Sequence, residues 1–178
     1  MNLYFRLLIL IIKSIFIKPD HSVKKWEVNF RVMPWDCDIN FHMTNSRYIA
    51  LQDLARTYSI VEMGLMKSVF KEKLAPVLSA QEISYLKPIR PFKQFTLTTE
   101  LVYWDEKYYY MEHRFIAGEK LYAKSMVRGV FVQNRDVIPT AEILKWAKVE
   151  TASPPMSAKV EAWKTLLEEK KLAVELEK

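Results

Sequence analysis

Glycine and cysteine are both scarce in this 178-residue sequence. Only three glycines occur, and no two of them are close enough to form the glycine-rich loops that hold phosphates in dinucleotide folds and P-loops. A single cysteine, Cys37, permits neither an internal disulfide nor a cysteine-rich zinc site, and it favours a reducing, cytoplasmic compartment. The sequence therefore predicts no metal and no other cofactor.

No apolar run is long enough to cross a bilayer, which takes about 20 residues. Residues 3–17 read LYFRLLILIIKSIFI, and no signal-peptide cleavage site follows them. At 100° per residue, Arg6 and Lys13 share one narrow stripe and apolar side chains cover most of the remainder. This pattern predicts an amphipathic helix. Two interpretations stay open: peripheral membrane contact through residues 1–17, or packing on the folded domain or a dimer partner.

Positive charge is unevenly distributed along the chain. The net charge is +6, but residues 1–25 carry five basic residues against Asp20 alone, so the rest of the chain is nearly balanced. No helix-turn-helix, zinc-finger or RNA-recognition signature accompanies the basic residues. We therefore expect no nucleic-acid partner.

Hydrophobic periodicity predicts an α+β fold. Alternation with period two indicates strands at residues 26–32, 83–85, 95–103, 108–116 and 121–132, and helical spacing indicates one long helix over residues 46–63, ended by Gly64. Short polar breaks between the last three strands favour antiparallel hairpins. The expected architecture is a five-stranded antiparallel sheet around one central helix. Its free edge strand predicts a homodimer or tetramer.

The chain divides into three predicted segments: a leader at 1–22, a core domain at 23–138 and a helical extension at 139–178. Within the extension, residues 159–178 hold five lysines and five acidic residues, which predicts a solvated, ion-paired helix. Asp53 and Arg56, three positions apart on the central helix, are predicted to form a surface ion pair.

Acidic and polar residues gather where the first strand leads into the long helix. A carboxylate beside a helix N-terminus can act as a general base or a nucleophile, while the helix N–H groups polarise a substrate carbonyl. That chemistry suits acyl transfer, although turn and helix caps would use the same residue types. A metal site is not expected, because catalytic metals usually recruit ligands from more than one element. The cluster comprises Asp36, Asp38, Asn40, His42, Thr44 and Asn45.

One family shares this pattern. The run D-C-D-I-N-F-H-M-T-N-S-R-Y at residues 36–48 resembles the D-x-D-x-x-x-H-x-x-N-x-x-Y signature of hotdog thioesterases of the 4-hydroxybenzoyl-CoA thioesterase-like group. Further counterparts are Tyr85, residues 88–92 and the W-D-x-x-x-x-Y-x-E-x-R-F run at 104–115. The resemblance covers roughly residues 26–135, and it implies the hotdog fold.

The resemblance also implies an activity, hydrolysis of an acyl-CoA thioester. It assigns the chemistry to Asp38, polarisation of the carbonyl to the helix-start amide of Asn45, and a supporting role to Asp36. Phe41 stands where the family often has glycine. The residues expected to contact substrate are Asn45, His42, Phe41 and Tyr48.

Two other functions remain open at this point. One is a non-catalytic acyl- or lipid-binding module at the membrane surface, in which Asp38 only caps its loop. The other is a hotdog hydratase, whose D-x-N-x-x-H motif is nearly matched by Asp38, Asn40 and His42.

Overall fold

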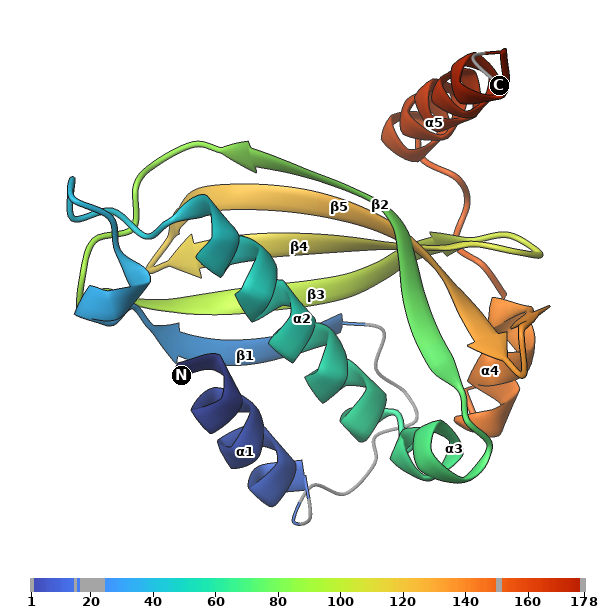
Figure 1. Ribbon diagram of the computed structural model, residues 1–178, viewed down its shortest axis with the longest axis horizontal. Helices are drawn as coiled ribbons and strands as arrows, with labels where there is room; N and C mark the ends of the chain where they lie inside the picture. The colour runs from blue at the N-terminus through green and yellow to red at the C-terminus, as the bar shows by residue number, and fades with distance from the viewer. Residues whose placement is uncertain (1, 15, 17–24, 150–151, 177–178) are drawn as a thin grey trace.

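An antiparallel sheet curls around one long helix, as Figure 1 shows. The computed structural model describes residues 2–14, 16, 25–149 and 152–176. In the sheet, the strand order is β1-β3-β4-β5-β2, with β6 paired to β5. The strands are β1 (Lys25–Arg31), β2 (Ala75–Tyr85), β3 (Gln94–Trp104), β4 (Tyr109–Ala117), β5 (Lys120–Gln133) and β6 (Asp136–Ile138). The helices are α1 (Asn2–Ser14), the 3₁₀ turn η1 (Pro34–Asp36), α2 (Asn45–Glu62), α3 (Met66–Lys71), α4 (Thr140–Trp146) and α5 (Ala158–Leu176).

The predicted α+β architecture is confirmed, with small differences at the edges. The central helix α2 begins and ends within one residue of its predicted bounds, and Gly64 follows it with a positive φ of 72°. Strand β2 begins at Ala75, well before the predicted start at residue 83, and it includes Pro76. A proline is tolerated there because β2 is an edge strand that pairs only with β5 among the described residues.

The core lies between α2 and the inner face of the sheet. Tyr48, Leu51 and Ala55 project from one face of α2 into this layer, as their helical spacing predicts. They belong to a buried cluster with Leu97 and Phe115 of β3 and β4. A second buried cluster continues toward α4 and includes Leu101, Met111, Val127, Phe131, Ile143 and Leu144.

The ion pair predicted on α2 between Asp53 and Arg56 is present, but it is only partly at the surface. Asp53 is exposed, whereas Arg56 is only 8% exposed and turns inward. Its Nη1 lies 3.2 Å from His113 Nε2, and His113 Nδ1 lies 3.0 Å from Thr99 Oγ1. Burial, together with the Arg56 charge, holds the pKa of His113 well below its ordinary value. Arg56, His113 and Thr99 thus form a chain of hydrogen-bonded polar side chains in the core. These bonds offset the free-energy cost of burying polar groups.

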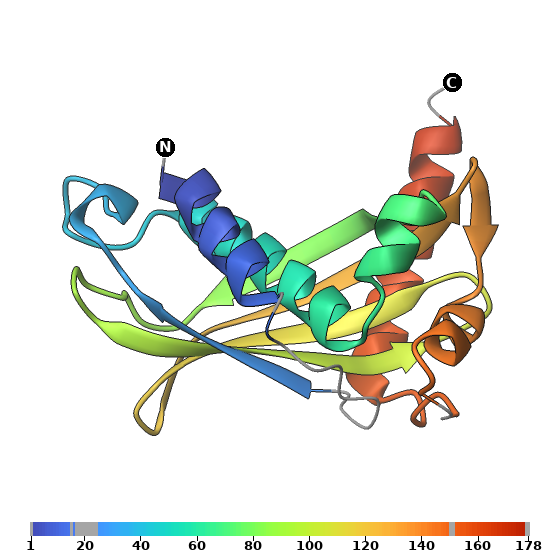
Figure 2. The same cartoon turned by 90° about the horizontal axis from the view of Figure 1, so that it is seen from below.

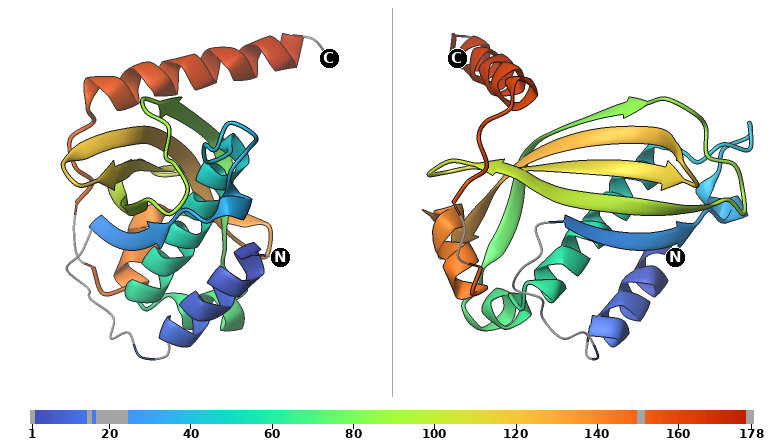
Figure 3. Two further views of the ribbon diagram at one scale, coloured as in Figure 1. Left: turned by 90° about the vertical axis from the view of Figure 1, so that its left-hand side faces the viewer. Right: turned by 180° about the vertical axis from the view of Figure 1, so that it is seen from behind.

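The C-terminal helix α5 is not merely a solvated helix. It lies on the opposite side of the sheet from α1 and α2 (Figure 3). Val160 and Trp163 are buried against Tyr110 and Met126 on the outer face of the sheet. The predicted charges lie around this contact, where Lys164 pairs with Asp105 at 2.9 Å and Lys159 pairs with Glu112. The equal numbers of lysines and acidic residues in this segment gave no sign that Val160 and Trp163 would be buried against the sheet.

Helix α1 packs beside α2 (Figure 2). Leu10 is buried in the core cluster, with Leu3 and Leu7 packed against it. Arg6 faces the protein as well, since its side chain is only 14% exposed. The opposite face is apolar yet exposed: Tyr4, Phe5, Leu8, Ile9, Ile11 and Ile12. Of the two interpretations of the leader, packing on the domain is therefore observed. None of the described helices is both long and apolar enough to traverse a bilayer.

Candidate active site

A tight loop joins η1 to α2 and carries the Asp-rich cluster. Cys37 and Met43 form an isolated antiparallel bridge at its base. The Asp38 N–H donates to the His42 carbonyl at 2.9 Å, and the Thr44 N–H donates to the Asp36 carbonyl at 3.0 Å. Backbone bonds therefore fix residues 37–43 as a closed loop directly in front of the helix.

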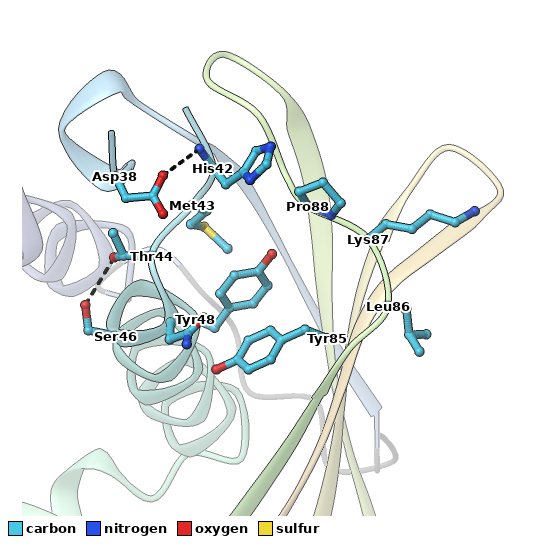
Figure 4. Close-up of a pocket in the computed structure, with 11 residues that line it drawn as sticks. Asp38, His42, Met43, Thr44, Ser46, Tyr48, Tyr85, Leu86, Lys87 and Pro88 are labelled. Carbon is cyan, nitrogen blue, oxygen red and sulfur yellow. Dashed lines mark hydrogen bonds between the residues drawn. The ribbon is translucent and has the colours of Figure 1, made fainter. Parts of the chain in front are cut away.

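The Asp38 carboxylate belongs to this loop and remains exposed. Its Oδ1 accepts the His42 N–H at 3.2 Å (Figure 4) and the Asn40 N–H at 2.9 Å. The His42 N–H, with the Asn40 N–H, holds the pKa of Asp38 below its ordinary value, because both bonds favour the anion. Asp38 is consequently a carboxylate throughout the neutral pH range.

The N-terminus of α2 faces the same space. Thr44 is the N-cap and Asn45 the first helical residue, so Asn45 does not cap the helix itself. The Thr44 hydroxyl makes no capping hydrogen bond, and it lies 3.1 Å from the Ser46 hydroxyl instead. The first N–H groups of a helix have no partner within the helix, and they carry its positive dipole end. An anionic oxygen near Asn45 would be stabilised there.

A cavity of about 540 Å³ lies between this loop and the end of β2. Four of the predicted site residues, Asp38, His42, Asn45 and Tyr48, line it together. Tyr48 and Tyr85 meet edge to face with ring centroids 5.0 Å apart, as Figure 4 shows. Burial raises the pKa of Tyr48 to about 12, so its phenol stays protonated. The remaining lining residues are Met43, Thr44, Ser46, Leu86, Lys87 and Pro88.

Two predicted site residues lie outside this cavity. Phe41 is 71% exposed at the loop tip, and its φ of 56° lies in the left-handed region that favours glycine. That conformation gives a physical reason for the glycine common at this position in the family. Asp36 is completely buried beneath the loop, where it pairs with Arg6 and Arg47.

Leu86 and Lys87 are lining residues that pattern reasoning missed. Both are exposed residues just after β2 and show no periodic signal. The strand pairing of β2 with β5 brings them opposite the Asp38 loop, so only the tertiary fold could identify them.

The described residues do not favour a metal site or a reactive thiol at Cys37. Among the residues that the structure describes, no group of three or more His, Cys, Asp and Glu side chains could hold a metal ion. Burial, reinforced by the Asp36 and Asp38 charges, raises the pKa of the Cys37 thiol. A raised pKa disfavours a thiolate nucleophile.

With this geometry described, comparison with known proteins identifies the family. The model of the thioesterase-like superfamily matches residues 32–163. The chain belongs to this family. Protein THEM6 of Xenopus laevis is 30% identical over 135 residues, which cover 74% of this chain and 63% of that protein. A probable thioesterase of Saccharomyces cerevisiae is 28% identical over 117 residues, covering 64% of this chain and 50% of that protein. The chain spans about half to two thirds of the length of these relatives.

Solved structures confirm the predicted hotdog fold of this family member. A 4-hydroxybenzoyl CoA thioesterase, crystallised with 4-hydroxybenzoyl CoA, superposes with a TM-score of 0.64 at 14% identity, covering 70% of this chain and 99% of that one. A gentisyl-coenzyme A thioesterase superposes with a TM-score of 0.62 at 20% identity, covering 68% of this chain and 98% of that one. At these identities the likeness concerns the fold.

Proposed function

We propose that this protein hydrolyses acyl-CoA thioesters, with Asp38 as the catalytic carboxylate. One observation carries the proposal: the anionic Asp38 side chain and the N-terminus of α2 line a single cavity. Membership of the thioesterase-like superfamily supports the same reaction class. A thioester suits one carboxylate and a few N–H donors, because its sulfur donates little electron density to the carbonyl. The carbonyl carbon is therefore reactive enough that no strong nucleophile is required.

Two routes use the same groups. In the first, Asp38 takes a proton from water as the water oxygen bonds to the thioester carbon. In the second, the carboxylate attacks that carbon directly and forms a mixed anhydride, which water then hydrolyses. In both routes the carbonyl oxygen becomes anionic against the amide of Asn45, the carbon–sulfur bond breaks, and CoA leaves as a thiolate that takes up a proton.

The cavity lining favours an acyl group with apolar or aromatic character. Tyr48, Tyr85 and Met43 offer ring and thioether surfaces beside the reacting position. Lys87 adds a cationic side chain at the far wall, which suits the phosphates of CoA.

Turnover of a panel of acyl-CoA esters by the purified full chain tests the proposal. The panel includes aromatic and aliphatic acyl groups, each offered as the CoA ester and as the matching pantetheine thioester. We expect hydrolysis that Asp38→Asn slows by about 100-fold or more, and a lower KM for CoA esters than for pantetheine esters. Single turnover in ¹⁸O water tests the anhydride route, because ¹⁸O enters Asp38 only when water hydrolyses the anhydride at the aspartyl carbonyl. Absence of hydrolysis across the panel would refute the proposal.

A non-catalytic acyl- or lipid-binding module is the second candidate. The observation that favours it is the double hydrogen bond to Asp38 Oδ1, which is also what a purely structural loop cap would make. Fatty acid that co-purifies with the protein, without turnover of any thioester, would favour this candidate over hydrolysis.

We further propose that the protein is a homodimer or a dimer of dimers. The outer edge of β2 has no strand partner among the described residues, and an exposed edge of this length invites pairing with a second copy. Light scattering at micromolar concentration should report an oligomer, and a monodisperse monomer would contradict this.

Peripheral membrane contact through residues 1–17 is also part of the proposal. The outward face of α1 presents Tyr4 and Phe5 to solvent, although it belongs to a helix seated on the domain. Co-sedimentation with anionic vesicles should fall when Phe5 is changed to Gln. Equal binding of the Phe5→Gln variant and the unaltered protein would contradict a role for this face.

A further inference from the structure

A buried ion pair links the N-terminal helix to the loop that carries Asp38. The side chain of Asp36 is 0% exposed, and its Oδ2 lies 2.6 Å from Arg6 Nη2 of α1. The Met33 N–H donates to the same oxygen at 2.9 Å. Arg47, in the first turn of α2, reaches Oδ1 at the longer distance of 3.4 Å. Burying a carboxylate this deeply is costly unless it is paired. The ion pair with Arg6 therefore helps to hold Asp36 in its buried position.

Asp36 in turn holds both components of the candidate site. Its carbonyl accepts the N–H of Thr44, the N-cap of α2. Two residues further along the chain is Asp38, whose carboxylate depends on the closed loop for its hydrogen bonds. A shift of Asp36 would therefore move Asp38 and the start of α2 relative to each other.

Arg6 is well suited to fix that position. The same Nη2 also donates to the Arg31 carbonyl at 3.2 Å, where β1 ends. Arg6 thus joins α1 to the end of β1 and to the turn before Asp38, at positions 25 and 30 residues further along the chain. Neighbouring Leu7 and Leu10 seat the helix against the core and so hold the guanidinium in place.

We propose that Arg6 is a positioning residue, through which the seating of α1 on the domain sets the geometry of the Asp38 loop. The kinetic part of this inference rests on the proposed thioesterase activity. Arg6 touches no substrate in this scheme. It acts through Asp36, and its loss loosens the loop without removing any reacting group.

The test compares variants of the full-length protein. Arg6→Gln removes the charge but keeps a polar side chain. Arg6→Lys keeps the charge but carries it on a shorter side chain, which reaches Asp36 and the Arg31 carbonyl less well. Leu8→Gln is the matched control, because it alters the same helix on its exposed face.

We expect Arg6→Gln to lower kcat about tenfold with KM changed less than about twofold, because misplaced reacting groups lose rate more than binding. Arg6→Lys should recover part of the rate, and Leu8→Gln should retain all of it. Combining Arg6→Gln with Asp36→Asn should cost no more than Asp36→Asn alone, since both break one link. Additive losses, or an unchanged kcat in Arg6→Gln, would overturn the proposal.

Hydrogen exchange gives a readout that does not depend on turnover. The N–H groups of Asn40, His42 and Thr44 should exchange severalfold faster in Arg6→Gln and at the original rate in Leu8→Gln. If the unaltered protein hydrolyses nothing while these amides still respond, the proposed function fails and the positioning role stands. Unchanged exchange in Arg6→Gln would overturn the positioning role itself.

Discussion

The Asp38 carboxylate accepts the backbone N–H of His42 at 3.2 Å, so the side chain that faces the cavity also closes its own loop. Both bonds to this loop use Oδ1, and Oδ2 takes part in neither. One oxygen can thus hold the loop while the other meets water or substrate. The carboxylate combines a structural and a chemical role, which substitution can separate.

Changing Asp38 to Asn should lower kcat by about 100-fold or more while the fold persists. Asn keeps the size and an oxygen that can accept the His42 N–H, but it lacks the charge needed to activate water or attack the thioester. Steady-state hydrolysis and thermal melting measured on the same preparation check both halves of this expectation.

Changing Asp36 to Asn should instead lower stability strongly and activity only modestly. We expect a loss of about 3 kcal/mol in the free energy of unfolding, because a buried ion pair is broken, and a fall in kcat of only about tenfold. Urea unfolding monitored alongside activity makes the comparison. Small, equal losses of activity in the two variants would remove Asp38 from the chemistry and favour the binding module.

Stability should fall in mild acid because of His113. Burial holds the pKa of His113 well below 6.5 in the folded protein, whereas the unfolded chain binds a proton near that pH. The folded form therefore loses stability as the pH drops below about 6.5, by up to about 1.4 kcal/mol per pH unit. Urea unfolding between about pH 7.5 and about pH 5 should reveal this slope. His113→Gln should flatten this slope.

The left-handed conformation of Phe41 predicts an unusual ranking of substitutions. At most positions glycine is less stable than alanine, but at a φ of 56° the Phe41→Gly variant should exceed Phe41→Ala by about 1 kcal/mol. Phe41 is mostly exposed, so the two variants lose similar packing. Ile39, which is 94% exposed and has no positive φ, is the matched control and should show the ordinary order. Chemical unfolding of the four variants measures both differences.

The buried side chains of α5 should contribute more to the free energy of unfolding than the ion pairs around them. Trp163→Ala should cost about 3 kcal/mol, because this buried ring packs against Tyr110 with centroids 6.3 Å apart. Trp146→Ala, at a more exposed tryptophan, should cost less than about 1 kcal/mol. Equal costs for the two tryptophans would mean that α5 contributes no core of its own.

Local pattern in the sequence determined much of this protein. The spacing of Tyr48, Leu51 and Ala55 predicted α2 and its buried face, since a helix repeats every 3.6 residues whatever surrounds it. The Asp-rich run predicted four residues that the fold does bring together around one cavity. Strand alternation likewise predicted the sheet, apart from the start of β2 and the short β6.

Only the tertiary structure decided which polar residues are buried and what they meet. Arg56 pairs with Asp53 as their spacing predicts, yet its buried side chain also meets His113, on a distant strand. Arg6 belongs to an apparently separate leader, yet it pairs with Asp36, thirty positions away. Such contacts leave no periodic trace, because the interaction of two charges depends on their separation in space and on their burial, and the chain fixes both only when it folds.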